Sequence, residues 1–137
     1  MKRKASAHWE GSLKEGNGKL STESTVLNGN QYSFKTRFED GVGTNPEELL
    51  AAAHAGCFTM AVSAALGQQG KTPERLDTEA AVTMEGMAIT GVHLKITGRV
   101  PGLSADEFAA VTKGAEQNCL VSKVLSIPIT SEAVLEG

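Results

Sequence analysis

The sequence predicts an α+β fold, in which the elements follow the order βββ-α-ββ-α-β. Three patterns lead to this expectation. Apolar and polar residues alternate in the first third of the chain and again over 76–100. Small and apolar residues dominate 49–66, and a capped, amphipathic stretch covers 104–118. Two helices are therefore expected to pack against antiparallel sheet.

The first third of the chain should form three antiparallel strands. Strand-like segments at 4–13 and 18–27 flank a polar turn, and an Asn-Gly pair at 28–29 is typical of a second, hairpin turn. The stretch 31–38, "QYSFKTRF", alternates and predicts the third strand. Arg37 would then lie near the end of that strand, on the face opposite its aromatic residues.

A long helix of about twenty residues is expected over 45–66. Asn45 can cap it, Pro46 suits its first position, and Glu48 suits a capping box. Because the helix has no long polar face after Glu48, it should be buried nearly all round. One small sheet covers one side only, so a partner chain is the simplest further cover. The pattern predicts a homodimer with the long helices near its centre.

The second half of the chain continues with two alternating segments, 76–86 and 90–100, which should pair as strands. Ser104 can cap a second helix that ends near Asn118. A break, a short helical turn and a last strand over 127–137 should follow. We expect one domain over 1–137, because the chain has 137 residues and no linker or repeat.

Composition argues against several classes of partner. The formal net charge is −3, aromatic residues make up 4%, and no run of Lys or Arg stands out, so we expect no nucleic-acid or anionic-membrane surface. The basic start lacks an apolar core behind it, and no stretch approaches the roughly 18 apolar residues of a membrane helix. A cytoplasmic location follows as the expectation. Two cysteines there point to chemistry rather than to a static disulfide.

The two cysteines, Cys57 and Cys119, are candidates for redox chemistry. A small buried hydrophobe is the plainer interpretation of each. A peroxidatic cysteine must instead be a thiolate near a positive group in a partly apolar pocket. Cys57 falls in the third turn of its helix, beyond the reach of the helix dipole, so it needs a cation. Arg37 is the candidate, although a solvated arginine is its plainer interpretation. A second thiol can condense with a sulfenic acid to give a disulfide.

Two stretches resemble a known family. "TNPEELLAAAHAGCFTMAVSAAL" and "NCLVSK" are similar to the cysteine motifs of the osmotically inducible protein C / organic hydroperoxide resistance (OsmC/Ohr) family, and 32–61 resembles the OsmC branch. The resemblance implies an OsmC-like intertwined homodimer with two interfacial active sites. It implies a thiol peroxidase that reduces organic hydroperoxides and is recycled by a dithiol, dihydrolipoamide or a lipoylated protein. No metal or bound cofactor is implied.

By position, the resemblance makes Cys57 the peroxidatic cysteine and Cys119 the resolving one. Arg37 matches the family arginine, and Glu47 matches the carboxylate that orients it. Leu120 stands where the family often has proline, which leaves the backbone at Cys119 less restricted.

Helix geometry adds an expectation about the assembly. On one straight helix, Glu47 and Cys57 would lie about 15 Å apart at ~1.5 Å per residue. An arginine that touches both would have to span most of that gap. Either Arg37 bridges the gap from the side, or one of the three groups comes from the other subunit. We expect the second arrangement, which fits a site at an interface.

Other interpretations stay open. The chain could be a binding or regulatory protein with inert cysteines, or it could exchange disulfides with proteins, although it has no C-x-x-C motif. His54 could lower the pKa of Cys57 or simply be packed. The four possible zinc ligands match no compact zinc module; they are His54, Cys57, His93 and Cys119. Most aromatic residues are expected in the core, although some could line an apolar entrance for the organic group of a hydroperoxide: Trp9, Phe34, Phe38, Phe58 and Phe108.

Overall fold

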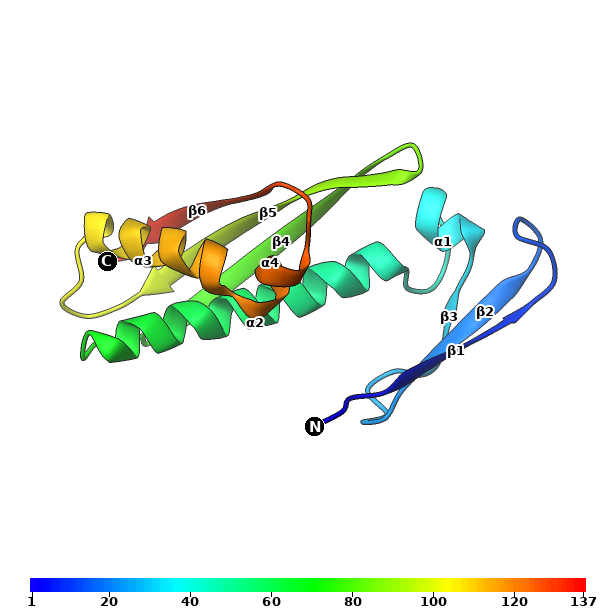
Figure 1. The fold of residues 1–137 in the computed structure, drawn as a ribbon, viewed down its shortest axis with the longest axis horizontal. Coiled ribbons are helices and arrows are strands. Elements are labelled where there is room, and N and C mark those ends of the chain that lie inside the picture. The colour runs from blue at the N-terminus through cyan, green and yellow to red at the C-terminus, as the bar shows by residue number, and fades with distance from the viewer. The chain divides into compact units, whose positions relative to one another are not determined.

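The computed structural model describes all 137 residues, which form two compact units, Met1–Leu49 and Leu50–Gly137 (Figure 1). The first unit contains β1 (Ala5–Glu10), β2 (Asn17–Thr22), β3 (Asn28–Tyr32), α1 (Phe34–Phe38) and the start of α2 (Pro46–Gln68). The second contains the rest of α2, β4 (Arg75–Glu85), β5 (Ala88–Arg99), α3 (Ala105–Asn118), α4 (Leu120–Val124) and β6 (Ile129–Leu135). The α+β class is confirmed, and one domain over 1–137 stays a prediction.

The first unit is built on an antiparallel sheet in the order β1-β2-β3. Gly18 on β2 pairs with both Trp9 and Tyr32. A side chain at Gly18 would come within 2.7 Å of the Trp9 ring and 2.5 Å of the Tyr32 ring. Because Gly18 has no side chain, the Trp9 and Tyr32 rings pack against each other over it, with their centroids 5.5 Å apart.

The prediction of a strand over 31–38 is wrong. β3 ends at Tyr32, and Phe34–Phe38 forms the short helix α1. A capping box starts this helix, because the Thr36 N–H donates to the Ser33 hydroxyl at 3.2 Å and the Ser33 N–H donates to the Thr36 hydroxyl at 2.8 Å. Arg37 therefore lies on a helix rather than at a strand end.

The predicted hairpin turn at 28–29 is also displaced. Both residues lie within β3, and the turn comes earlier, between Thr22 and Leu27. The Thr22 hydroxyl accepts a hydrogen bond from the Leu27 N–H at 3.1 Å, and the Thr25 N–H donates to the Thr22 carbonyl at 2.9 Å. These local bonds, one of them to the Thr22 side chain, outweigh the Asn-Gly signal.

Helix α2 begins at Pro46, as predicted, and Asn45 caps it. The Glu48 N–H donates to the Asn45 side-chain oxygen at 2.8 Å. The Asn45 amide also donates to the Thr36 carbonyl at 3.0 Å, which ties α1 to the start of α2. Glu48 does not complete the expected capping box but accepts a hydrogen bond from the Thr44 hydroxyl at 2.8 Å.

The second unit has a sheet in the order β4-β5-β6. β4 and β5 are antiparallel, as predicted, but β6 runs parallel to β5. The prediction of purely antiparallel sheet is therefore wrong for this strand. Helices α3 and α4 lie in the connection between β5 and β6, and this crossover brings the chain back in the same direction.

Helices α2 and α3 cover one face of this sheet and form its core with β5 (Figure 1). The fully buried side chains of these elements include Phe58, Val62 and Leu66 of α2, Leu94 and Ile96 of β5, and Phe108 of α3. Gly98 of β5 allows the close approach of α3, because a side chain there would come within 2.7 Å of the Phe108 ring.

In the single chain α2 is buried on one face rather than nearly all round. The exposed positions recur at helical spacing and are mostly small: Ala52, Ala53, Gly56, Met60, Ser63, Ala64 and Gly67. Met60 keeps 75% of its surface exposed. With a mean hydropathy of 1.7, α2 is also long and apolar enough to cross a membrane, contrary to our expectation that no stretch approaches this. Core helices of soluble proteins pass the same test, so the absence of a membrane partner stays a prediction.

Replacing Gly43 by Ala should destabilise the first unit. Gly43 has a φ of +131°, and an added side chain would meet the Gln31 carbonyl oxygen at 2.3 Å. We expect the substitution to lower the free energy of unfolding by more than about 1 kcal/mol. The matched control is Gly114→Ala in α3, where an added side chain has nothing within 4 Å. Urea unfolding monitored by circular dichroism gives the midpoints; a Gly43→Ala midpoint equal to or above that of the unsubstituted chain contradicts this account.

Candidate active site

The two cysteines lie together in the second unit as free thiols. Cys57 is on α2 and is partly exposed, whereas Cys119 is 1% exposed and joins α3 to α4. The Cys119 N–H donates to the Ala115 carbonyl at 2.9 Å, and its own carbonyl accepts from the Lys123 N–H at 3.1 Å. The predicted break after the second helix is thus the corner that carries the second thiol.

The thiol of Cys57 has its pKa lowered by its neighbours. Burial alone raises the pKa, but hydrogen bonds from the Cys119 thiol and from the backbone N–H groups of Val121 and Leu120 lower it by more. The net pKa therefore lies below the ordinary value of a cysteine. These N–H groups belong to the first turn of α4, where helix N–H groups have no partner within the helix.

The pKa of Cys119 moves in the opposite direction. Burial raises it most, and the hydrogen bond to Cys57 raises it further, while the N–H and hydroxyl of Ser122 and the N–H of Val121 lower it in part. We therefore expect Cys57 to ionise before Cys119. This difference in pKa is the one expected between an attacking thiolate and a resolving thiol.

Leu120 contributes to this arrangement through its backbone. Its N–H is one of the donors that lower the pKa of Cys57. A proline at this position would have no N–H to donate. Reasoning from side chains alone did not find these backbone donors, and the only sequence signal for them is the helix start directly after Cys119.

Arg37 and Glu47 pair in the first unit. The Arg37 Nε donates to Glu47 Oε1 at 2.7 Å, and the Arg37 guanidinium carbon lies 5.4 Å from the centre of the Phe38 ring. Glu47 is buried, with its side chain 10% exposed, and Arg37 is 42% exposed. The Asn45 bridge between α1 and α2 holds the two partners opposite each other. Neither terminal NH₂ group of Arg37 has a hydrogen-bond partner in the structure, so these donors are available to a ligand.

The four expected site residues thus form two pairs, one in each unit. Arg37 pairs with Glu47 in the first unit, and Cys57 pairs with Cys119 in the second. That the pairs join in one site, and that one of the groups comes from a second subunit, stays a prediction.

A pocket of about 320 Å³ opens beside Arg37 in the first unit. Its lining is mainly aromatic and apolar and includes Trp9, Leu13, Tyr32, Phe34, Phe38 and Pro46. The expectation of a core position is wrong for Trp9, Phe34 and Phe38, which are only partly buried. They line this pocket instead, and an apolar lining is the alternative expected for some of the aromatic residues. The same prediction is confirmed for Phe58 and Phe108, which are fully buried.

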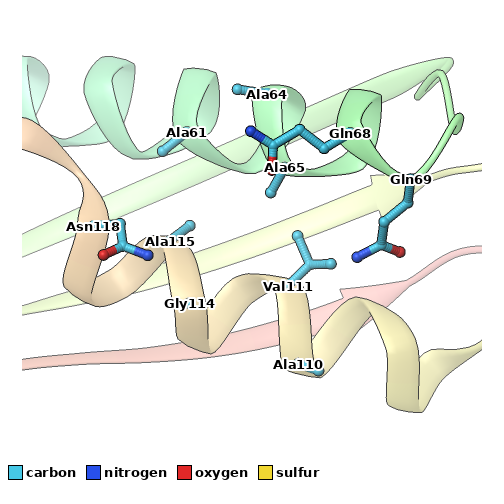
Figure 2. Close-up of a pocket in the computed structure, with 10 residues that line it drawn as sticks. All are labelled: Ala61, Ala64, Ala65, Gln68, Gln69, Ala110, Val111, Gly114, Ala115 and Asn118. Carbon is cyan, nitrogen blue, oxygen red and sulfur yellow. The ribbon is translucent and has the colours of Figure 1, made fainter.

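A second pocket of about 400 Å³ lies between α2 and α3 (Figure 2). Small side chains line it, among them Ala61 and Ala65 of α2 and Ala115 of α3, and the amides of Gln68 and Asn118 lie at its edges. No acidic, basic or thiol group belongs to the lining. The pocket could hold a small ligand, but its lining has no charged or nucleophilic group that could react with one.

His54 is a packed histidine, in agreement with the plainer interpretation. It is 0% exposed, and its Nε2 lies 2.7 Å from the Ser122 hydroxyl oxygen. Burial lowers its pKa, which keeps the imidazole neutral. His93 lies on an exposed position of β5 and bonds to Thr130 at 2.6 Å, so the four-residue zinc set does not form.

Comparisons with known proteins place the chain in a family. The family described as OsmC-like protein matches residues 38–132. The chain is 49% identical to "Peroxiredoxin OsmC" of Escherichia coli (strain K12), over 98% of this chain and 97% of the relative. It is 37% identical to "Organic hydroperoxide resistance protein OhrA" of Bacillus subtilis (strain 168), over 65% of this chain and 66% of the relative.

Solved structures share the fold at lower sequence identity. An OsmC-like protein of unknown function from Vibrio cholerae has a TM-score of 0.74 at 14% identity, covering 98% of this chain and 99% of that one. The organic hydroperoxide resistance protein OhrB of Bacillus subtilis has a TM-score of 0.68 at 19% identity, covering 97% and 98%. With the family match over most of its length and a full-length relative at 49% identity, the chain belongs to the OsmC-like protein family.

Proposed function

We propose that this chain reduces organic hydroperoxides to alcohols, with Cys57 as the peroxidatic and Cys119 as the resolving cysteine. The relatives named peroxiredoxin, at 49% identity over nearly the whole chain, make it a peroxidase-type enzyme. The observation that supports the residue assignment is that the two free thiols are neighbours, with Cys57 partly exposed and Cys119 buried, and the opposite shifts in their pKa agree with it. A thiolate with a protonated thiol beside it has both groups that a two-cysteine peroxidase needs.

The first step is attack by the Cys57 thiolate on the terminal oxygen of the hydroperoxide. A sulfur–oxygen bond forms, the oxygen–oxygen bond breaks, and the alkoxide takes up a proton and leaves as the alcohol. Cys57 is left as a sulfenic acid. The guanidinium of Arg37, oriented by Glu47, polarises the peroxide and stabilises the charge that develops on the leaving oxygen.

The second step is attack by Cys119 on the Cys57 sulfenic acid. A disulfide forms, the sulfur–oxygen bond breaks, and the oxygen leaves as water with the proton from Cys119. An external dithiol, dihydrolipoamide or a lipoylated protein, then restores both thiols by exchange. Because Cys119 is buried and Cys57 partly exposed, the dithiol attacks from the Cys57 side. No metal or bound cofactor takes part in these steps.

The aromatic pocket beside Arg37 supports an organic substrate. Its apolar lining would bury the carbon part of a hydroperoxide, and Arg37 at its edge would face the peroxide group. Hydrogen peroxide gains nothing from an apolar wall and should be reduced more slowly.

The proposed enzyme works as a homodimer in the cytoplasm, without nucleic-acid or membrane partners. The exposed, small-residue face of α2 supports the dimer, because a second copy would bury it and allow close helix packing. In this arrangement one subunit supplies its Arg37–Glu47 pair to the other's Cys57.

Replacing each cysteine by serine should separate the two steps. We expect Cys57→Ser to abolish turnover with cumene hydroperoxide, because no thiolate remains to attack. Cys119→Ser should allow one oxidation per site and then stall in the absence of an external thiol. The measurement is a count of free thiols before and after one equivalent of hydroperoxide.

In the unsubstituted protein, this count should fall by both thiols as the disulfide forms. No loss of thiols would favour the binding or regulatory interpretation. Faster oxidation by a disulfide substrate than by the hydroperoxide would favour thiol–disulfide exchange.

Changes at the Arg37–Glu47 pair should reduce the rate of Cys57 oxidation. Arg37→Lys removes the planar fork that can bind Glu47 and a peroxide together, and we expect roughly a tenfold or greater loss in the second-order rate. Glu47→Gln should cause a smaller loss, because the amide can still accept from the Arg37 Nε.

The matched control is Arg75→Lys, since Arg75 also pairs with carboxylates, Asp77 and Glu136, but in the second unit. Stopped-flow oxidation by cumene hydroperoxide gives the rates. An Arg37→Lys rate that equals the Arg75→Lys rate would exclude Arg37 from the site.

A further inference from the structure

A buried hydrogen bond joins the segments that carry the two cysteines. His54 lies three residues before Cys57 on α2, and Ser122 lies three residues after Cys119 on α4. The His54 Nε2 and the Ser122 hydroxyl oxygen are 2.7 Å apart, with His54 0% and Ser122 8% exposed. One helical turn from the thiols on each side, α2 and α4 are thus fixed to each other away from water.

The other ring nitrogen of His54 tells which way the hydrogen bond runs. Nδ1 is buried and has no hydrogen-bond partner. A buried N–H without a partner is rarer in proteins than a buried acceptor without one, so we assign the proton to Nε2. The Nε2–H then donates to the Ser122 oxygen.

This direction leaves the hydroxyl hydrogen of Ser122 free for another acceptor. The Cys119 thiol lies one turn earlier in the chain, and Ser122 is among the groups that lower its pKa. The buried His54–Ser122 bond therefore lies beside the Cys119–Cys57 pair and orients the Ser122 hydroxyl there.

We propose that His54 and Ser122 are positioning residues for the disulfide-forming step, in which they hold Cys119 against Cys57 and support the negative charge that develops on its sulfur. The inference rests on the proposed function. As the sulfur–sulfur bond forms, the Cys119 proton passes to the oxygen that leaves Cys57, and water is released. The Ser122 hydroxyl stabilises the sulfur while it loses this proton, and the neutral His54 keeps the hydroxyl oriented. Both residues act on Cys57 only through Cys119, so the first step should depend on them much less than the second.

The test compares four variants with a control. Ser122→Ala and His54→Leu remove the donors. Ser122→Thr retains the hydroxyl, and His54→Gln retains an N–H donor near the position of Nε2. Thr112→Val is the matched control, because it removes a buried hydroxyl of the same unit that has no hydrogen-bond partner.

Reduced protein is mixed with one equivalent of cumene hydroperoxide and quenched at intervals with dimedone, and mass spectrometry counts sulfenic acid and disulfide. We expect Ser122→Ala and His54→Leu to slow the conversion of sulfenic acid to disulfide about tenfold or more, the scale of losing a hydrogen bond to a charged group. The formation of the sulfenic acid should change less than about threefold. The retaining variants and Thr112→Val should lie within about threefold of the unsubstituted protein in both steps.

Two results would overturn the inference: disulfide formation in Ser122→Ala at the unsubstituted rate, or Ser122→Thr and His54→Gln as slow as the variants that remove the donors. If one of these variants does not fold, as judged by circular dichroism, the remaining pair decides. Oxidation by diamide is the second measurement. Diamide forms an adduct on Cys57, and Cys119 displaces it, so the rate of disulfide formation reports the Cys119 step directly. If the hydroperoxide forms no sulfenic acid, the proposed function is contradicted, but the diamide measurement still tests the roles of His54 and Ser122.

Discussion

The contact between the Cys57 and Cys119 thiols is the interaction on which the proposed chemistry depends. Two neighbouring cysteines in identical surroundings would have equal pKa values, and neither would ionise in preference to the other. Here burial and donation raise the pKa of Cys119, while acceptance lowers that of Cys57. The backbone N–H groups at the start of α4 add to the difference. The fold thus places two chemically identical side chains in different surroundings, which is what the proposed division of roles requires.

The second unit is arranged so that this contact can form. α2 carries Cys57 and packs on the sheet through Phe58, Val62 and Leu66. α3 packs against the same sheet through Phe108, which comes close to β5 because Gly98 has no side chain. The end of α3 then brings Cys119 to α2. The parallel β6 follows from the same path, because the chain must cross over through α3 and α4 before it pairs with β5.

The sequence predicted the elements that local signals define and missed those that depend on competing contacts. Asn45 and Ser104 cap helices where expected, since capping needs only neighbours along the chain. The stretch 31–38 alternates like a strand, but the Ser33–Thr36 capping box makes it a helix. Cys57, Cys119, Arg37 and Glu47 could be named from motifs. The backbone donors at Cys57 could not, because every residue but proline has an N–H and only the tertiary fold aims it at the sulfur.

The most direct test is the order in which the two thiols ionise in the unsubstituted protein. Reduced protein is labelled briefly with monobromobimane over a range of pH, and mass spectrometry of the peptides assigns the label to Cys57 or Cys119. The same chain unfolded in urea gives the reference midpoint for an ordinary thiol. We predict a midpoint below this reference for Cys57 and above it for Cys119. Coincident midpoints, or a lower midpoint for Cys119, would contradict the account.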